Sequence, residues 1–313
     1  MSTMNTTGTV PDAGRATTPR GFASYYGRPV LKPPAWKPLH IGGYLYLGGL
    51  AGASSVFAAG GQVTSRPGLA RAGKVAALAG ITLSMVALVE DLGRPGRFLN
   101  MLRVFKLTSP MSVGSWLLAG YGPLVGLSAF ADLTGRLPLL GKAACYGSAV
   151  LGPAVTTYTA VLISDTAVPA WHEGHREMPF LFAGSATATA AGAALIAAPA
   201  AESAPARRAA LFGTALELAA GRLMRHRMGM IAEPYHQGRA GALTLAGEVL
   251  AAAGAVGAVL STRSRRATVL SGAALMAAAA CTRFGVFAAG TASAADPKYT
   301  VVPQRALIDR MGE

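Results

Sequence analysis

Five polar side chains of this 313-residue chain lie at the ends of long apolar segments, and their types and spacing suit proton exchange. His40 and Tyr44 are four residues apart, one turn on the same side of a helix. Tyr158 and Asp165 are seven residues apart, two turns on one face, and Asp91 ends another apolar segment. A quinone headgroup needs donors to its carbonyl oxygens and a carboxylate or histidine that exchanges protons. The pattern therefore predicts a quinone pocket, with Tyr158, His40 and Asp165 as reacting groups and Tyr44 and Asp91 as further contacts.

Each of these residues also has a purely structural interpretation. A histidine or tyrosine at a membrane boundary is a common interface anchor. Glu90 and Asp91 stand close to Arg94 and Arg97, which would make a solvated salt-bridge cluster. The functional interpretation depends on convergence, because three segments present His, Tyr and acids at a similar depth on one face. A passive membrane anchor with no site is the plainest alternative.

The elements that must position these residues are long apolar segments. A helix of about 20 residues crosses the hydrocarbon core of about 30 Å, and eight stretches of the chain have that length and character. The sequence thus predicts an all-α polytopic membrane protein with eight transmembrane helices. They are expected over residues 39–61, 70–90, 112–131, 140–163, 179–198, 206–224, 241–260 and 268–290.

Composition supports a membrane protein and argues against several other classes. Charged residues are 13% of the chain and the mean hydropathy is +0.40, far from the roughly 25% charged residues of soluble domains. The net charge of +14 comes from loop Lys and Arg, which favours lipid headgroups and topology over nucleic acid. Two cysteines cannot hold an iron–sulfur cluster, and no histidine lies in mid-span to ligate a haem. We expect no metal and no prosthetic group in this chain, and no nucleic-acid partner.

The links between the segments alternate in length, so the two faces of the protein differ. Links 2–3, 4–5 and 6–7 are long and lie on the side of both termini, here called the elaborated face. The opposite, short-loop face has only tight connections, two of them purely basic. Function is expected on the elaborated face. The charge count alone leaves the orientation open, since the whole terminal face is more basic, yet short loops follow the positive-inside rule best.

Three ionisable residues lie inside the second half of the predicted bundle: Glu217, Glu248 and Arg283. Glu248 and Arg283 are predicted at similar depths, about 10 Å below the elaborated face, so they can pair. They form either a structural ion pair or a proton path. The second possibility leads to the alternative function, an ion-translocating or transporter module.

Four stretches resemble the NrfD-like family, membrane subunits of polysulphide-reductase type. They are PPAWKPLHIGGYLYLGGLAGASS, DLGRPGRFLNMLRVFKLTSPMSVGSW, TYTAVLISDTAVPAWHE and TRFGVFAAGTASAADPKYTVVPQR. The resemblance implies two four-helix bundles, over 39–165 with the quinone site and over 166–290. The sequence adds an N-terminal tail and interfacial arm over 1–38, with the arm at Phe22–Trp36, and a C-terminal tail over 291–313. The resemblance also implies menaquinone or ubiquinone as an exchangeable substrate and places Tyr158 in its pocket. It puts His40 among polar quinone contacts and Asp91 in the DLGRP element, whereas Asp165 has no clear counterpart.

The same resemblance implies partners. A four-cluster iron–sulfur subunit would dock on the elaborated face and contact a molybdopterin catalytic subunit, with formate-dehydrogenase-like subunits as candidates. We therefore expect a quinone-reactive subunit of an oxidoreductase in the cell membrane, with both termini and the long loops extracytoplasmic. The stretch Tyr299–Arg305 is predicted to run extended along the iron–sulfur subunit, because Pro297 and Pro303 disfavour a helix.

Overall fold

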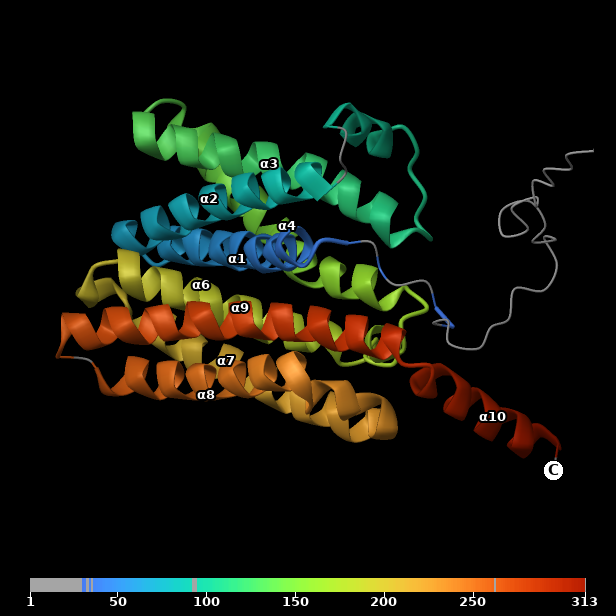
Figure 1. The fold of residues 1–313 in the computed structure, drawn as a ribbon. Coiled ribbons are helices and arrows are strands. Elements are labelled where there is room, and N and C mark those ends of the chain that lie inside the picture. Colours follow the sequence, from blue (N-terminus) through green and yellow to red (C-terminus); the bar gives the residue numbers. More distant parts are fainter. Residues whose placement is uncertain (1–29, 32–33, 35, 92–94, 262, 313) are drawn as a thin grey trace, which may run out of the picture.

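The computed structural model describes residues 30–31, 34, 36–91, 95–261 and 263–312, and most of them are helical. Eight long helices lie side by side along one direction (Figure 1). Within the described residues there is no strand, so the predicted all-α architecture is confirmed. The long helices are α1 (Pro38–Val63), α2 (Pro67–Asp91), α3 (Pro110–Thr134), α4 (Pro138–Ser164), α6 (Met178–Ala197), α7 (Ala204–Met228), α8 (Gly238–Leu260) and α9 (Arg265–Ala295).

Proline marks where these helices begin. The first four long helices each start at a proline, a position where the missing N–H costs nothing and the fixed φ suits a helix. The end of α3 is marked by Gly135, which has a φ of +69° and whose N–H donates to the carbonyl of Ala131. The predicted span boundaries consequently agree with the observed helices to within a few residues, except at the C-terminal ends of α7 and α9.

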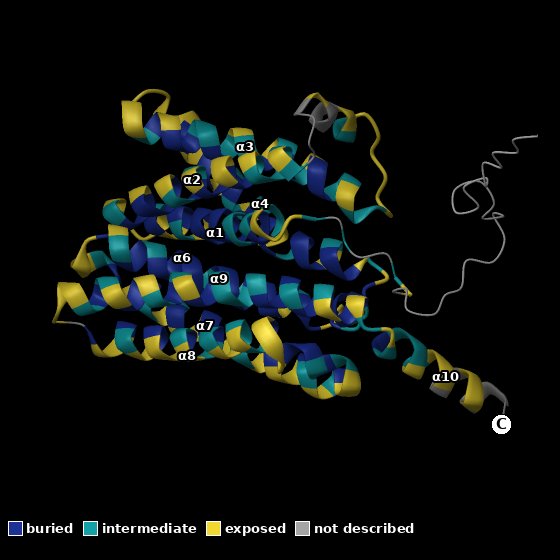
Figure 2. Cartoon of the chain, in the orientation of Figure 1, coloured by how far each residue is buried: buried dark blue, intermediate teal, exposed yellow. Residues whose placement is uncertain are grey.

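Helices α1–α4, here called the first bundle, contact one another, and α6–α9, the second bundle, do the same. Helix α1 also contacts α6 and α9 along the middle of the molecule (Figure 1). Small residues allow this close approach. A Cβ on Gly73 would lie 2.6 Å from the backbone nitrogen of Ala58, so α1 and α2 touch through their backbones. Figure 2 shows the buried residues concentrated along the lines where helices face each other.

Seven of the long helices are apolar and long enough to cross a membrane. The exception is α7, in which Arg207, Arg208, Glu217 and several arginines near its C-terminal end lower the hydropathy. The predicted count of eight membrane spans is therefore not confirmed by composition. Helix α7 still has a buried face that contacts α6 and α8. That face contains Ala206, Ala210, Gly213, Thr214, Glu217, Ala220, Gly221 and Met224.

The two ends of the molecule differ as the link lengths predict. At the end where α1 begins and α9 finishes lie the 3₁₀ segments η1 (Pro95–Leu102) and η3 (Gly229–Tyr235) and the short helix α5 (Pro169–His172). This elaborated end is on the right in Figure 1. At the opposite end the described residues form tight turns and the short segment η2 (Ala200–Glu202).

The predicted extended conformation of Tyr299–Arg305 is wrong, because Lys298–Gly312 forms helix α10. Asp296 caps this helix, since its side chain accepts from the N–H of Lys298 at 2.9 Å. Pro297 stands at the helix start, where its carbonyl accepts from Val301. Pro303 lies inside the helix and removes one backbone bond. The Asp-Pro pair begins a helix here, and α10 extends away from the bundles (Figure 1).

Candidate functional site

Two tyrosines from different helices meet inside the first bundle. Tyr44 of α1 is 3% exposed, Tyr158 of α4 is 9% exposed, and their hydroxyl groups are hydrogen-bonded to each other. Gly114 of α3 makes room for this arrangement, since a Cβ there would lie 2.5 Å from the ring of Tyr158. Ser84 of α2 donates to the carbonyl of Tyr44 at 3.2 Å and fixes that turn of α1. The predicted convergence of Tyr44 and Tyr158 is thus observed.

His40 lies one turn before Tyr44, between the two acids that end α2. Its Nε2 is 3.6 Å from Oε2 of Glu90, and its Nδ1 is 3.9 Å from Oδ1 of Asp91. Asp91 also accepts from the backbone N–H of Lys37 at 3.4 Å, which ties the start of α1 to the end of α2. The Nδ1 atom of His40 is buried and has no hydrogen-bond partner among the described residues. At 3.6 and 3.9 Å the two carboxylates lie just beyond hydrogen-bond range of the ring, so a proton would pass between them through a bridging water or after a small approach of the side chains.

Asp165 and the nearby histidines stand apart from this cluster. Asp165 is exposed at the C-terminal end of α4, two turns beyond Tyr158. His172 and His175 each place Nδ1 against a backbone carbonyl, of Ser164 at 3.2 Å and of His172 at 2.9 Å. The structure therefore does not bring Asp165 into contact with the Tyr44–Tyr158 pair. Its predicted role as a reacting group stays a prediction. Arg94, and the side chain of Arg97, lie outside the described residues.

Trp171 joins the N-terminal arm to the second bundle, a role that the sequence did not reveal. It is fully buried, and its indole N–H donates to the carbonyl of Val286 at 2.8 Å. Trp36 stacks on it with ring centroids 5.7 Å apart, and Phe287 lies at 5.6 Å. The Trp36 end of the predicted arm is thus packed against the body, whereas residues 22–29 lie outside the described part of the chain.

The ionisable residues of the second bundle pair differently from the prediction. Glu248 of α8 forms its salt bridge with Arg225 of α7, not with Arg283. Arg283 of α9 is 1% exposed and donates to the carbonyl of Phe182 at 2.8 Å. Glu217 of α7 is 4% exposed and accepts from the hydroxyl of Thr282 at 2.6 Å. The predicted pairing of Glu248 with Arg283 is wrong. Helix α7 continues past residue 224, the predicted end of its span, and Arg225 in this extension is the partner of Glu248.

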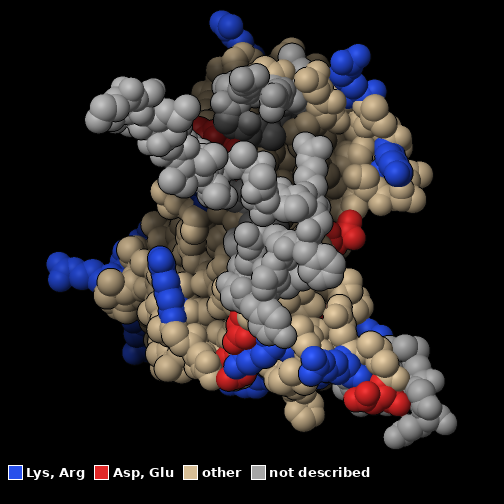
Figure 3. All heavy atoms as spheres, turned by 45° about the vertical axis from the view of Figure 1, so that its right-hand side comes forward, with Lys and Arg blue, Asp and Glu red and all other residues tan. Residues whose placement is uncertain are grey.

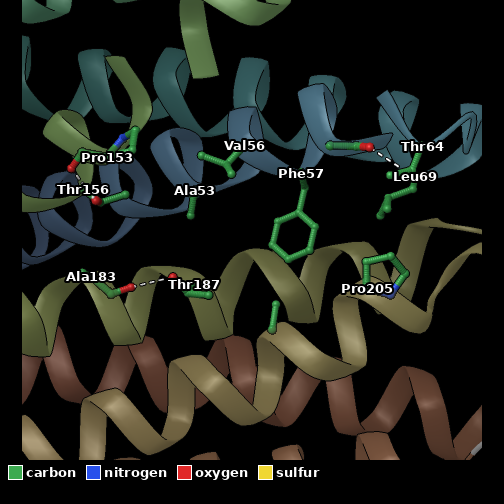
Figure 4. A pocket seen from close by; sticks show the side chains of 12 residues that line it. Ala53, Val56, Phe57, Thr64, Leu69, Pro153, Thr156, Ala183, Thr187 and Pro205 are labelled. Carbon is green, nitrogen blue, oxygen red and sulfur yellow. Dashed lines mark hydrogen bonds between the residues drawn. The ribbon is translucent and has the colours of Figure 1, made fainter. Parts of the chain in front are cut away.

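Two apolar cavities lie along the first bundle. One of about 470 Å³, here called the α2 groove, runs along α2 from Leu78 to Glu90 and is bordered by Gly122 of α3. At one end of this groove lies Glu90, the acid whose Oε2 is 3.6 Å from Nε2 of His40. The other, of about 460 Å³, lies between the two bundles, where Phe57 of α1 points across toward α6 (Figure 4). No described ionisable residue lines this inter-bundle cleft, so of these two cavities the α2 groove is the one that leads to groups that exchange protons.

Several buried polar contacts were not anticipated from the sequence. Tyr121 of α3 is fully buried and shares a hydrogen bond of 2.7 Å with Ser55 of α1. Lys74 of α2 is 7% exposed and pairs with Asp132 of α3 at 2.8 Å. Part of the signal was present, since Lys74 lies inside the predicted span 70–90 and Asp132 directly follows the predicted span 112–131, and charges at such positions need partners. Among the described residues, no group of three or more His, Cys, Asp or Glu is arranged to hold a metal ion.

The comparison with known families gives one match that covers most of the chain. The family model described as polysulphide reductase, NrfD, matches residues 31–294. The matched stretch begins in the arm before α1 and ends within the last turn of α9. It contains the His40–Glu90–Asp91 cluster, the two tyrosines and the ionisable residues of the second bundle. No curated protein matches the chain.

Proposed function

Since the chain belongs to the NrfD family of polysulphide-reductase membrane subunits, we propose that it passes electrons between a docked iron–sulfur subunit and the quinone pool. The observation that carries this proposal is the position of His40. It lies between Glu90 and Asp91 and one turn from the buried Tyr44–Tyr158 pair, at the elaborated end of the first bundle. This is a set of proton-exchanging groups beside hydroxyl donors, which quinone chemistry requires.

The proton side of the reaction falls to His40 and its acids. Reduction of a quinone takes up two protons with two electrons, and oxidation of the quinol releases them. Glu90 has a side chain that is 60% exposed, so it can exchange protons with solvent. His40 is 3.6 Å from Glu90 and is itself only 21% exposed. Protons would pass from solvent through Glu90 to His40 and then inward, while the Asp91 carboxylate, 3.9 Å from Nδ1, favours the protonated ring.

The hydroxyls of Tyr44 and Tyr158 supply the donors to the quinone oxygens. In the structure these two hydroxyls satisfy each other, so a bound headgroup would take the place of their mutual hydrogen bond. Burial favours the hydrogen bonds to the headgroup, because water competes little for hydroxyl donors inside an apolar site. Asp165, exposed at the end of α4, would act at the entrance rather than on the headgroup.

The α2 groove suits the isoprenoid tail of a quinone. It is lined by Leu78, Ile81, Met85, Val86 and Val89 and ends at Glu90. Leu78 to Glu90 spans twelve residues, about 18 Å of helix, long enough for several isoprene units. A tail in this groove would hold the headgroup at the polar end, where His40 lies.

The elaborated end offers the surface for the iron–sulfur subunit. Helix α10 is fastened there by Lys298, which pairs with Glu233 of η3 at 2.9 Å, and by Tyr299, whose hydroxyl donates to the same carboxylate at 3.1 Å. Basic and acidic side chains lie together where α10 leaves the body, at the lower right of Figure 3. Val302 and Ile308 of α10 are about half and two-thirds exposed. This mixture of charged and apolar side chains suits a protein partner, with a molybdopterin subunit beyond it.

The test is quinone turnover by the complex purified with its iron–sulfur partner. Tyr158→Phe removes one hydroxyl donor and should lower the rate about 10²-fold, by analogy with deleting one preorganised donor. His40→Ala should have a similar effect. Tyr121→Phe is the matched control, because Tyr121 is equally buried and its hydroxyl bonds to Ser55 away from His40. The proposal fails if Tyr158→Phe and His40→Ala turn over quinone as fast as Tyr121→Phe.

A further inference from the structure

Glu217 is a buried carboxyl group that is only half satisfied. One oxygen, Oε1, accepts from Thr282 at 2.6 Å. The other, Oε2, is buried and has no hydrogen-bond partner among the described residues. An unpaired carboxylate oxygen in the interior of a membrane protein is costly, because the bilayer offers no water to replace the bond. Such a group either binds water or takes up a proton.

Arg283 does not lock Glu217 into its charged form. The guanidinium of Arg283 lies over the ring of Phe182, 3.6 Å from the centroid, and donates to the carbonyl of the same residue. Its Nε and Nη1 atoms have no hydrogen-bond partner among the described residues. No salt bridge joins it to Glu217 in the described structure. Arg283 therefore keeps its contacts with the Phe182 ring and carbonyl when Glu217 is neutral.

A small cavity lies in front of Glu217. Its volume is about 30 Å³, enough for a water molecule. Polar side chains from four elements line it: Glu217 and Arg225 of α7, Glu248 and Thr244 of α8, Thr282 of α9 and Tyr235 of η3. Tyr235 belongs to the elaborated end, and the Arg225–Glu248 salt bridge lies in the wall of the cavity. The cavity therefore lies between Glu217 and the elaborated end, with this salt bridge in its wall.

On the other side of Glu217 the helices are in backbone contact. A Cβ on Gly184 of α6 would lie 2.5 Å from the backbone nitrogen of Glu217. Further toward the short-loop end, a Cβ on Gly192 would lie 2.5 Å from the carbonyl of Gly272 in α9. Alanines of α6 and α7 fill the remaining interior there. These contacts place close-packed backbone between Glu217 and the short-loop end, whereas the small cavity beside Glu217 lies toward the elaborated end.

We propose that Glu217 is a proton-binding site of the second bundle, loaded from the elaborated face through the water-sized cavity beside Arg225 and Glu248. A hydronium ion transfers its proton to Oε2: one O–H bond of the hydronium breaks, an O–H bond to Oε2 forms, and a water molecule is released. The ionisable groups facing it are Arg225 on its own helix, Glu248 on α8, Arg283 on α9 and Tyr235 on η3. Helix α6 contributes the hydroxyl of Ser185. The proposal does not depend on quinone reactivity.

The experiment is infrared difference spectroscopy of the full chain in lipid nanodiscs as the pH is lowered, in H₂O and in D₂O. We expect a carboxylic-acid carbonyl band that grows with proton binding and shifts in D₂O, because the site is in contact with water. Glu217→Gln should abolish this band. Asp132→Asn is the matched control and should keep it, since Asp132 is a partly buried carboxylate of the first bundle that is paired with Lys74 and lies outside this cavity.

A second variant guards against a folding failure of Glu217→Gln. Thr282→Val removes the hydrogen bond to Oε1 and should move the carbonyl band to higher frequency without abolishing it. If the carbonyl band is unchanged in Glu217→Gln, or is not shifted in Thr282→Val, the proton is bound by another group and the proposal is overturned. A spectrum without any such band would also overturn it. These results leave the quinone assay of Tyr158→Phe unaffected, so the two proposals fail separately.

Discussion

The contact between Arg227 and Glu177 fastens the end of α7 to the start of α6, and its loss should be measurable. Arg227 donates from Nε to Oε1 of Glu177 at 2.7 Å and from Nη2 to Oε2 at 2.8 Å. The same Nη2 also donates to the carbonyl of Glu173. The side chain of Glu177 is 10% exposed and that of Arg227 is 28% exposed. This is a bidentate and mostly buried pair, a geometry that lysine cannot reproduce.

The expected magnitude lies between two limits. An exposed ion pair contributes about 0–1 kcal/mol, whereas removal of one partner from a fully buried pair costs about 3–5 kcal/mol. For a pair as buried as this one, Arg227→Ala should lower the free energy of unfolding by about 2 kcal/mol. Arg176→Ala is the control, because Arg176 is the exposed neighbour of Glu177 and should change that free energy by less than about 0.5 kcal/mol.

The pH dependence of this effect has a definite sign. The hydrogen bonds from Arg227 hold the pKa of the Glu177 carboxyl below its ordinary value. A group with a lowered pKa in the folded state stabilises it fully above the unfolded-state value of about 4.3. That contribution disappears as the pH falls through the folded-state pKa. The stability gap between the wild type and Glu177→Gln should be constant near neutral pH and close in acid.

The assay is reversible unfolding in mixed detergent micelles for the wild type, Glu177→Gln, Arg227→Ala and the double variant. A coupling energy of about 1 kcal/mol or more is expected at neutral pH. The reasoning is refuted if the two substitutions are additive within error. It is equally refuted if the gap between the wild type and Glu177→Gln is as large in acid as at neutral pH.

Two further predictions concern topology and docking. With Cys145 and Cys281 replaced by serine, Arg305→Cys should react with an impermeant thiol reagent in intact cells and Arg263→Cys should not; the reverse pattern would invert the orientation. Truncation after Ala295 removes α10 and the Lys298–Glu233 contact, so the eight long helices should fold while the iron–sulfur partner dissociates at moderate salt. If Glu233→Gln and the truncated protein both keep their partner, the interface lies elsewhere.

The lengths and limits of the membrane helices were predictable because they depend on local properties. Apolar length and a starting proline are visible in the sequence, and Pro38, Pro67 and Pro110 each begin a helix. The C-terminal end of α7 was not predictable in this way, because the stretch remains helical to Met228 although Arg222, Arg225 and Arg227 lower its hydropathy. The start of α10 was also missed, although Asp296 and Pro297 form a recognisable cap.

Contacts between helices were predictable only where two signals coincided. His40 and Asp91 were expected at the same depth on the same face, and the structure brings them to 3.9 Å. Depth alone was not sufficient for Glu248 and Arg283. The choice of partner depends on how each helix is rotated about its axis, and segments made mostly of Ala and Gly show no strong asymmetry that would reveal it.

This rotation is what distinguishes the two bundles chemically. In the first bundle α1 and α4 turn their tyrosines toward each other, and His40 meets two acids at the surface. In the second, α7 turns Arg225 toward Glu248 and leaves Glu217 facing a small cavity. Arg283 stands between them, since a Cβ on Gly49 of α1 would lie 3.1 Å from its Nη2. A change of charge at Glu217 would therefore act on a guanidinium that touches α1, the helix that holds His40 and Tyr44, which gives the two bundles a direct physical link.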